Sequence, residues 1–202
     1  MEMAAAGGLT LVPEEKRNPL NTTTYGVGEM IADAIDRGCE SIVMGIGGSA
    51  TCDAGEGMLR ALEDSGHRHT ECKSTVACDV TNPLYGEQGA AYVFAPQKGA
   101  TPEQVKMLDQ RLRAFAYKTE KDGIASADMA NYPGAGAAGG LGYAFLSYLN
   151  AKLQSGIDII LDIAGFDEML KDADIVITGE GKSDAQTLMG KVPDGVRKRC
   201  IS

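Results

Sequence analysis

The sequence of 202 residues is poor in histidine and in basic side chains. Its two histidines, His67 and His69, lie in one polar stretch, and a cysteine nucleophile needs a histidine as its base, so we do not expect a Cys–His catalytic pair. There are 19 Lys and Arg residues against 28 Asp and Glu, which gives a formal net charge of −9. This balance argues against nucleic acid or an anionic membrane surface as the main partner.

The five cysteines form no C-x-x-C pair, and no apolar run is long enough to cross a membrane. Without a signal peptide, this pattern predicts reduced thiols in a cytoplasmic protein. His67, His69 and Cys72 could ligate a metal in principle, but a fourth ligand at zinc-finger spacing is missing. We therefore expect a solvated loop over 63–74.

Glycine, in contrast, is abundant, with 26 residues gathered in clusters. The first cluster lies between a predicted strand at 42–46 and a helical pattern that begins at 58. Such a turn binds anions well, because glycine lets backbone N–H groups approach a ligand and a helix N-terminus favours negative charge. Ser49, Thr51 and Asp53 either cap the helix or reach a ligand or cation. We predict that the whole cluster binds a phosphate or a carboxylate.

Apolar periodicity predicts the remaining elements. Helices are expected over 25–37, 102–118, 141–153 and 166–172, and strands over 75–80, 90–95, 156–163 and 173–178. The helix at 102 begins with proline behind a capping box formed by Thr101 and Gln104. Together these elements indicate an α/β fold, with a layered parallel or mixed sheet and helices on both faces.

Charged residues lie at or after the ends of three of these strands. Asp79 ends the strand at 75–80, where it suits Mg²⁺ or another ligand, or else forms an Asx-turn that leads into Pro83. Lys98 is predicted to be an exposed cation in the turn 96–100. A third loop, after 178, carries Gly179, Glu180, Gly181, Lys182 and Asp184.

Two segments match part of a known nucleotide-binding motif but lack a feature that the motif requires. The loop after 178 ends like a P-loop, but Val176 stands where a Walker A motif needs glycine. A second glycine cluster, 133–142, matches G-x-G-x-x-G without a preceding strand, so tight packing explains Gly136 as well as ligand binding does. The first cluster does follow a strand, which keeps a dinucleotide-binding oxidoreductase as an alternative, although no acid-ended strand follows about twenty residues on.

In this order, the loops resemble the type I glycerate kinase family. The similar segments are 2–6 with 11–13, 15–20, 22–26, 45–53, 76–84, 96–100, 133–140 and 177–181. The resemblance implies a two-domain α/β enzyme that transfers the γ-phosphoryl group of ATP, with Mg²⁺, to a hydroxyl group of glycerate. It also implies that 1–175 form the central α/β domain, and that 176–202 begin a segment that returns to the second, nucleotide-binding-like domain.

The sequence departs from the family pattern in three ways. Segments that the family has at both ends are absent, and the connection 63–74 is shorter. Cys52 and Ala54 stand where the family usually has Asn and Gly, and Lys182 and Ser183 replace Arg and an apolar residue. A non-catalytic remnant is therefore a further alternative to an active kinase.

For the kinase reaction, the resemblance and the loops together suggest a set of site residues. Catalytic candidates are Asp184, Asp53 and Lys182, and candidates for binding substrate or phosphate are Gly47, Gly48, Ser49, Thr51, Gly136, Gly179 and Gly181. Asp79 and Glu180 are candidate Mg²⁺ ligands, and Lys98 is a second cation that could balance phosphate charge. The sequence leaves the roles of Asp53, Asp79 and Asp184 open. We expect the bends at Gly48, Gly136 and Gly181 to meet at one rim of the sheet, in a protein that could form a homo-oligomer.

Overall fold

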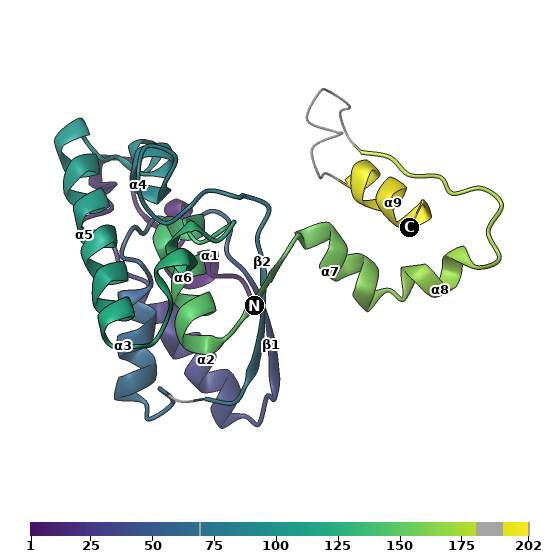
Figure 1. The fold of residues 1–202 in the computed structure, drawn as a ribbon, viewed down its shortest axis with the longest axis horizontal. Helices are drawn as coiled ribbons and strands as arrows, with labels where there is room; N and C mark the ends of the chain where they lie inside the picture. The colour runs from purple at the N-terminus through teal and green to yellow at the C-terminus, as the bar shows by residue number, and fades with distance from the viewer. Residues whose placement is uncertain (69, 181–191, 202) are drawn as a thin grey trace. The chain divides into compact units, whose positions relative to one another are not determined.

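The computed structural model describes residues 1–68, 70–180 and 192–201. The chain divides into two compact units, residues 1–153 (unit 1) and 154–202 (unit 2). Figure 1 colours the chain by residue number, from purple at the N-terminus to yellow at the C-terminus. Within the described residues, no helix is both long and apolar enough to span a membrane.

Unit 1 contains a small sheet surrounded by helices (Figure 1). Its helices are α1 (Ala4–Gly7), α2 (Tyr25–Asp36), α3 (Glu56–Asp64), α4 (Ala90–Phe94), α5 (Pro102–Lys121) and α6 (Ala137–Leu149). Short 3-10 turns cover Leu9–Leu11, Glu14–Lys16, Pro96–Lys98 and Ala127–Asn131. The strands are β1 (Ser41–Gly45), β2 (Lys73–Ala77) and β3 (Lys152–Gln154), which reaches the division between the units.

The strands pair in the order β1-β2-β3, and β1 runs parallel to β2 with Gly45 opposite Ala77. The start of the chain pairs with β1: the Met3 N–H donates to the Gly45 carbonyl at 2.9 Å, and the Gly45 N–H donates to the Met1 carbonyl at 2.9 Å. Parallel strands with helices in the connections confirm the predicted α/β class. Because parallel strands end at one edge, the loops that follow β1 and β2 start side by side.

The core follows from the alternation of side chains along the strands. Ile42 and Met44 of β1 are buried, whereas Val43 between them is 41% exposed. They belong to a cluster that also contains buried residues of β2 and of three helices: Val76, Val27, Ile31, Met58, Leu62, Leu141 and Phe145. A second cluster, with Leu84, Leu108 and Leu112, packs α4 and α5 against Tyr143 of α6.

Three predicted strands are wrong. Residues 90–95 form helix α4, in which Ala90 and Ala91 are completely buried, and 156–163 form helix α7, capped by the Ser155 hydroxyl. Residues 173–178 lie in neither a helix nor a strand. The cause is the same for the first two, because a short apolar run fits a buried strand and a buried helix equally well.

The helix predicted to end at 153 ends earlier. Asn150 adopts a left-handed conformation with φ of +47°, and its N–H donates to the Phe145 carbonyl, which closes α6 at Leu149. Asparagine tolerates this conformation better than other non-glycine residues. The released chain then forms β3.

Unit 2 consists of α7 (Gly156–Ile163), α8 (Phe166–Leu170) and α9 (Val192–Cys200). Arg199 of α9 forms ion pairs with Asp158 and Asp162 of α7 and with Asp167 of α8. A Cβ atom on Gly195 would lie 2.6 Å from the Ile157 side chain, so α9 packs closely against α7.

Candidate active site

A cavity of about 400 Å³ opens where β1 and β2 end. Its walls come from the segments after the two strands, from the turn Pro96–Lys98 and from the start of α6: Ile46, Gly47, Gly48, Ser49, Ala77, Cys78, Asp79, Val80, Leu9, Phe94, Gln97, Lys98, Ala137 and Ala138. The carboxyl ends of parallel strands are the usual ligand position in α/β proteins. The cavity is therefore the candidate active site.

The loop from Gly47 to Thr51 forms one wall and is fixed by the start of the chain. The Gly48 carbonyl accepts a hydrogen bond from Leu9 N–H at 2.8 Å, and Ala50 N–H donates to the Gly7 carbonyl at 2.8 Å. Gly48 has a φ of +70°, and Gly47 has no atom within 4 Å of the position of a Cβ.

The backbone of this loop offers donors to a ligand. In the part of the chain that the structure describes, no acceptor is assigned to the N–H groups of Gly47, Gly48 and Ser49. Successive N–H groups around a left-handed glycine form an anion-binding concavity. Binding of a phosphate or a carboxylate by this loop stays a prediction.

Lys98 lies behind the loop as a buried cation. Its side chain is 3% exposed, and Nζ donates to Ser49 Oγ at 2.7 Å and to the Thr51 carbonyl at 2.7 Å. The prediction of an exposed cation was wrong. The residue after the turn, Gly99, packs closely against the backbone of Arg17: a Cβ on Gly99 would lie 2.2 Å from the Arg17 carbonyl oxygen.

Burial also changes the acid–base properties of this region. Loss of solvation lowers the pKa of Lys98 to about 8, although Cys52 and Asp53 act in the opposite direction. Burial likewise raises the pKa of the Cys52 thiol to about 11, partly offset by Lys98. Thr51 is fully buried, and its Oγ1 has no hydrogen-bond partner among the described residues.

The second glycine cluster packs tightly beside the cavity. A Cβ on Gly136 would lie 2.1 Å from the Pro83 carbonyl oxygen, and one on Gly139 would lie 2.1 Å from the Thr51 carbonyl oxygen. This close approach places Ala137 and Ala138 in the cavity wall, whereas Gly136 is not part of the lining. The geometry thus favours the packing alternative for Gly136.

Asp53 points away from this cavity. Its carboxylate accepts hydrogen bonds from the backbone N–H of Thr24 at 2.8 Å, of Gly55 at 3.1 Å and of Gly57 at 3.3 Å. The Thr24 hydroxyl donates to the same carboxylate at 2.9 Å and accepts from Met58 N–H. The contacts favour the capping alternative, in which Asp53 joins the N-termini of α2 and α3.

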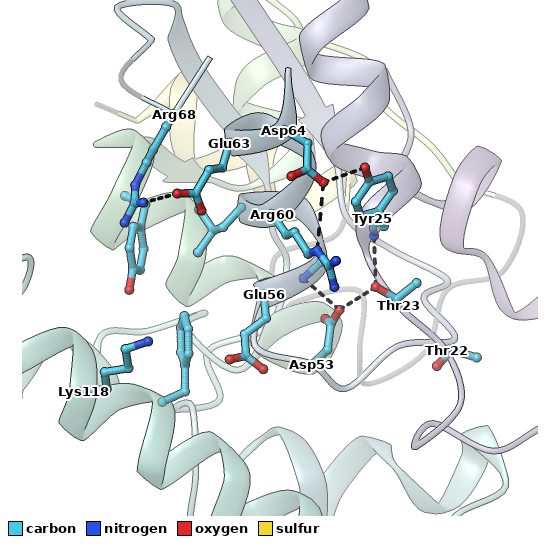
Figure 2. Close-up of a pocket in the computed structure, with 14 residues that line it drawn as sticks. Thr22, Thr23, Tyr25, Asp53, Glu56, Arg60, Glu63, Asp64, Arg68 and Lys118 are labelled. Carbon is cyan, nitrogen blue, oxygen red and sulfur yellow. Dashed lines mark hydrogen bonds and ion pairs between the residues drawn. The ribbon is translucent and has the colours of Figure 1, made fainter. Parts of the chain in front are cut away.

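Asp53 borders a separate hollow of about 960 Å³ between α3 and α5. Figure 2 shows its carboxylate beside Thr23, with Glu56 next to it and the Arg60–Asp64 ion pair above. Both acidic and basic side chains line this hollow, so it has no single charge preference.

Asp79 lines the strand-end cavity from the β2 side and is exposed. Among the residues described, no three His, Cys, Asp or Glu side chains are grouped to hold a metal ion. This finding includes His67 and Cys72, while His69 lies outside the described residues.

The third predicted loop is described only in part. Gly179 is exposed and Glu180 is half-buried, whereas Gly181, Lys182 and Asp184 lie outside the described residues. The convergence of the three bends therefore stays a prediction. Unit 1 brings the Gly48 bend and the residues that follow Gly136 to one cavity.

Sequence reasoning missed the apolar part of the lining, Leu9 and Phe94, and the polar Gln97. Leu9 could not be found because it reaches the cavity only through the pairing of the first residues with β1. Phe94 precedes the Pro96–Lys98 turn and Gln97 lies within it, and recognising 90–95 as a helix would have placed them near Lys98.

Comparison with known proteins gives consistent matches along the chain. The sequence matches the model of the Glycerate kinase family over residues 1–69 and 63–202. It is 48% identical over 229 residues to a glycerate kinase of Bacillus subtilis (strain 168), covering 100% of this chain and 59% of the relative. It is 44% identical over 223 residues to the glycerate 2-kinase of Escherichia coli (strain K12), covering 97% of this chain and 58% of the relative.

A comparison with solved structures also finds a protein described as a glycerate kinase. The crystal structure of a putative glycerate kinase 2 from Salmonella typhimurium LT2 is similar with a TM-score of 0.88 and 43% identity, covering 99% of this chain and 60% of that one. The chain thus spans about three fifths of the length of these relatives. The two parts of the family match overlap at 63–69.

Proposed function

This chain belongs to the glycerate kinase family, and from that premise we propose that it phosphorylates D-glycerate to phosphoglycerate with ATP. The observation that carries the proposal is the strand-end cavity, which joins a glycine loop, a buried ammonium group and a carboxylate in one place. Because the chain spans about 59% of the Bacillus subtilis relative, the activity of the whole enzyme is part of the proposal.

The loop Gly47–Ser49 would hold the charged end of the small acid. Its N–H groups face no acceptor among the described residues, and a carboxylate accepts several such hydrogen bonds. Thr51 would act indirectly, because its carbonyl positions Lys98. The cavity volume of about 400 Å³ lies in the range of small-molecule sites.

ATP and Mg²⁺ are the proposed cofactors. Magnesium usually takes one or two protein carboxylates together with substrate phosphates, and Asp79 supplies a carboxylate at the cavity wall. Bound there with ATP, the ion would neutralise charge on the phosphate groups. Glu180 is a second proposed ligand.

Phosphoryl transfer depends mainly on alignment and charge neutralisation. We propose that Asp184 accepts or orients the substrate hydroxyl proton and that Lys182 balances phosphate charge, with Gly179 and Gly181 shaping their loop. Asp53 stays a catalytic candidate only in an indirect role, in which it positions the glycine loop that precedes it. Its carboxylate already accepts hydrogen bonds from the N-termini of α2 and α3.

Three further proposals concern the whole protein. Residues 1–175 would form the central domain, and 176–202 would begin a segment that returns to a second, nucleotide-binding-like domain. All five cysteines are free thiols, which supports a cytoplasmic location. A homo-oligomer stays a prediction.

The test is ADP release by the full chain with D-glycerate, ATP and Mg²⁺, with NAD binding as a control for the oxidoreductase alternative. We expect turnover that Asp184→Asn lowers by more than about 100-fold without a change in the unfolding midpoint, because a lost catalytic carboxylate removes a proton-transfer step. Unchanged turnover in that variant would remove Asp184 from the catalytic set. No ADP release, together with absent glycerate binding, would favour the non-catalytic remnant.

A further inference from the structure

Lys98 is a buried charge without a carboxylate partner in the described part of the chain. Its two hydrogen bonds go to neutral acceptors, Ser49 Oγ and the Thr51 carbonyl. Buried charges in proteins are normally paired, because an unpaired one loses its hydration without compensation. The missing negative charge is therefore expected to arrive with a ligand.

The hydrogen-bond count around Lys98 leaves donors directed at the cavity. An ammonium group has three N–H donors, and two of them are used within the protein. Ser49 Oγ accepts from Lys98, so its own proton must be donated elsewhere. Both side chains line the cavity and are at least nine-tenths buried, at 3% and 8% exposure.

This wall of the cavity therefore consists of donors. The third Lys98 N–H, the Ser49 hydroxyl and the N–H groups of Gly47 and Gly48 all require an acceptor. A group that only accepts and that carries negative charge, a carboxylate or a phosphate, satisfies them all. A neutral alcohol, which is itself a donor, satisfies them less well.

We propose that Lys98 is a specificity-determining residue, which with Ser49 binds an anionic oxygen of the ligand and so selects hydroxy acids over neutral polyols. The inference rests on the proposed function, since it names the group of the same site that recognises the acid. Carboxylate and phosphate share this chemistry, and the experiment separates them.

Ligand binding at this wall should depend on pH. Anion binding needs the charged form of Lys98, whose pKa burial lowers to about 8, so affinity should fall as the pH rises above that value. The ionisable groups that face Lys98 or share its cavity are Cys52, Cys78, Asp53 and Asp79. Burial raises the pKa of the Cys52 thiol to about 11 and also raises the pKa of the Cys78 thiol, so burial disfavours the thiolate at both positions.

The test is calorimetric titration of the full chain with D-glycerate, glycerol, inorganic phosphate and ATP between pH 7 and pH 10. The variants are Lys98→Met and Lys98→Arg, and Lys118→Met is the matched control, because Lys118 is an exposed lysine of α5 outside the cavity. Circular dichroism confirms folding. If Lys98→Met does not fold, Ser49→Ala takes its place, because it removes one donor and leaves the Lys98–Thr51 contact.

We expect the parent chain to bind D-glycerate and not glycerol, with affinity that declines above about pH 8. Lys98→Met should lower the affinity by about 10- to 100-fold, as for a lost hydrogen bond to a charged group, and should remove the pH dependence. Lys118→Met should change neither. A loss seen only with phosphate or ATP would assign the anion site to the phosphate and would refute the selection of hydroxy acids by Lys98.

Two further outcomes would overturn the inference. Equal glycerate, phosphate and ATP binding by the parent and by Lys98→Met would refute the role of Lys98. If Ser49→Ala stands in, equal binding would refute the joint anion site of Lys98 and Ser49. Both results would leave the proposed function intact. A parent chain that binds no glycerate, phosphate or ATP at any pH would refute the proposed function and the inference with it.

Discussion

At the residue scale, the site depends on a few polar groups that the fold has removed from water. Lys98 and Thr51 are almost fully buried, and Asp53 is held by backbone donors of two helices. The sequence identified Thr51 and Asp53 as polar members of a glycine-rich loop, and Lys98 as the cation of the turn 96–100. It did not distinguish a buried cation from a solvated one, or a capping carboxylate from a catalytic one, because both differences depend on neighbours far away in the chain.

Lys98 should make stability depend on pH. Its pKa is about 8 in the folded protein, against the ordinary lysine value of 10.5 that applies to the unfolded chain. Below pH 8 the charged form costs the folded state about 3 kcal/mol, and this cost is relieved as the pH rises from 8 to 10.5. In urea unfolding, the stability of the parent relative to Lys98→Met should therefore increase across this range. A constant difference would show that Lys98 titrates normally.

Asp53→Ala should destabilise the protein by about 2 kcal/mol, because it removes the acceptor for the N-termini of α2 and α3. The control is Asp33→Ala, which removes an exposed ion pair with Arg37 and should change stability by less than about 0.5 kcal/mol. Chemical unfolding measures both. If Asp53→Ala kept its stability and lost only activity, the catalytic alternative would be right.

At the element scale, caps and long periodic segments were predictable. The capping box of Thr101 and Gln104 is present at the start of α5, and α2 agrees with its prediction to within one residue at the C-terminus. Short apolar segments were not predictable. Residues 90–95 and 156–163 became helices, because five to eight apolar residues carry too little periodic information to separate the two structures.

The glycines of α6 should resist substitution because of close packing. Gly139→Ala places a Cβ 2.1 Å from the Thr51 carbonyl oxygen at a φ of +71°, so we expect a loss of about 3 kcal/mol and weaker ligand binding at the Lys98 side of the cavity. Gly123→Ala is the control, because its φ is +72° with no atom within 4 Å. It should cost only about 1 kcal/mol of backbone strain. If the two variants lost the same amount of stability in thermal unfolding, close packing at Gly139 would contribute nothing to the cost of the substitution.

At the scale of the whole molecule, the α/β class and the family are established, while the arrangement of the site depends on contacts between distant segments. The first eight residues pair with β1 and with the loop after it, and the turn Pro96–Lys98 reaches the same loop from the other side. None of these segments forms the cavity by itself. The cavity arises where they contact one another.

The accessibility of the cysteine thiols measures whether both units are folded. Cys39 and Cys200 are exposed, whereas Cys52 and Cys72 are buried, and burial raises the pKa of both buried thiols. A disulfide-exchange reagent at neutral pH should therefore modify two thiols quickly, and all five in denaturant. Rapid modification of four or five thiols in the native protein would contradict the packing of unit 1.

The sequence by itself determined the family, the α/β class, the long helices and the glycine loop after β1, because these follow from local pattern and from the order of the motifs. Only the tertiary structure decided that Lys98 is buried, that Asp53 caps two helices and that Gly136 packs instead of lining the cavity. The physical reason is that each of these features depends on a contact with a distant segment of the chain: Lys98 with Ser49, Asp53 with Thr24, and Gly136 with Pro83.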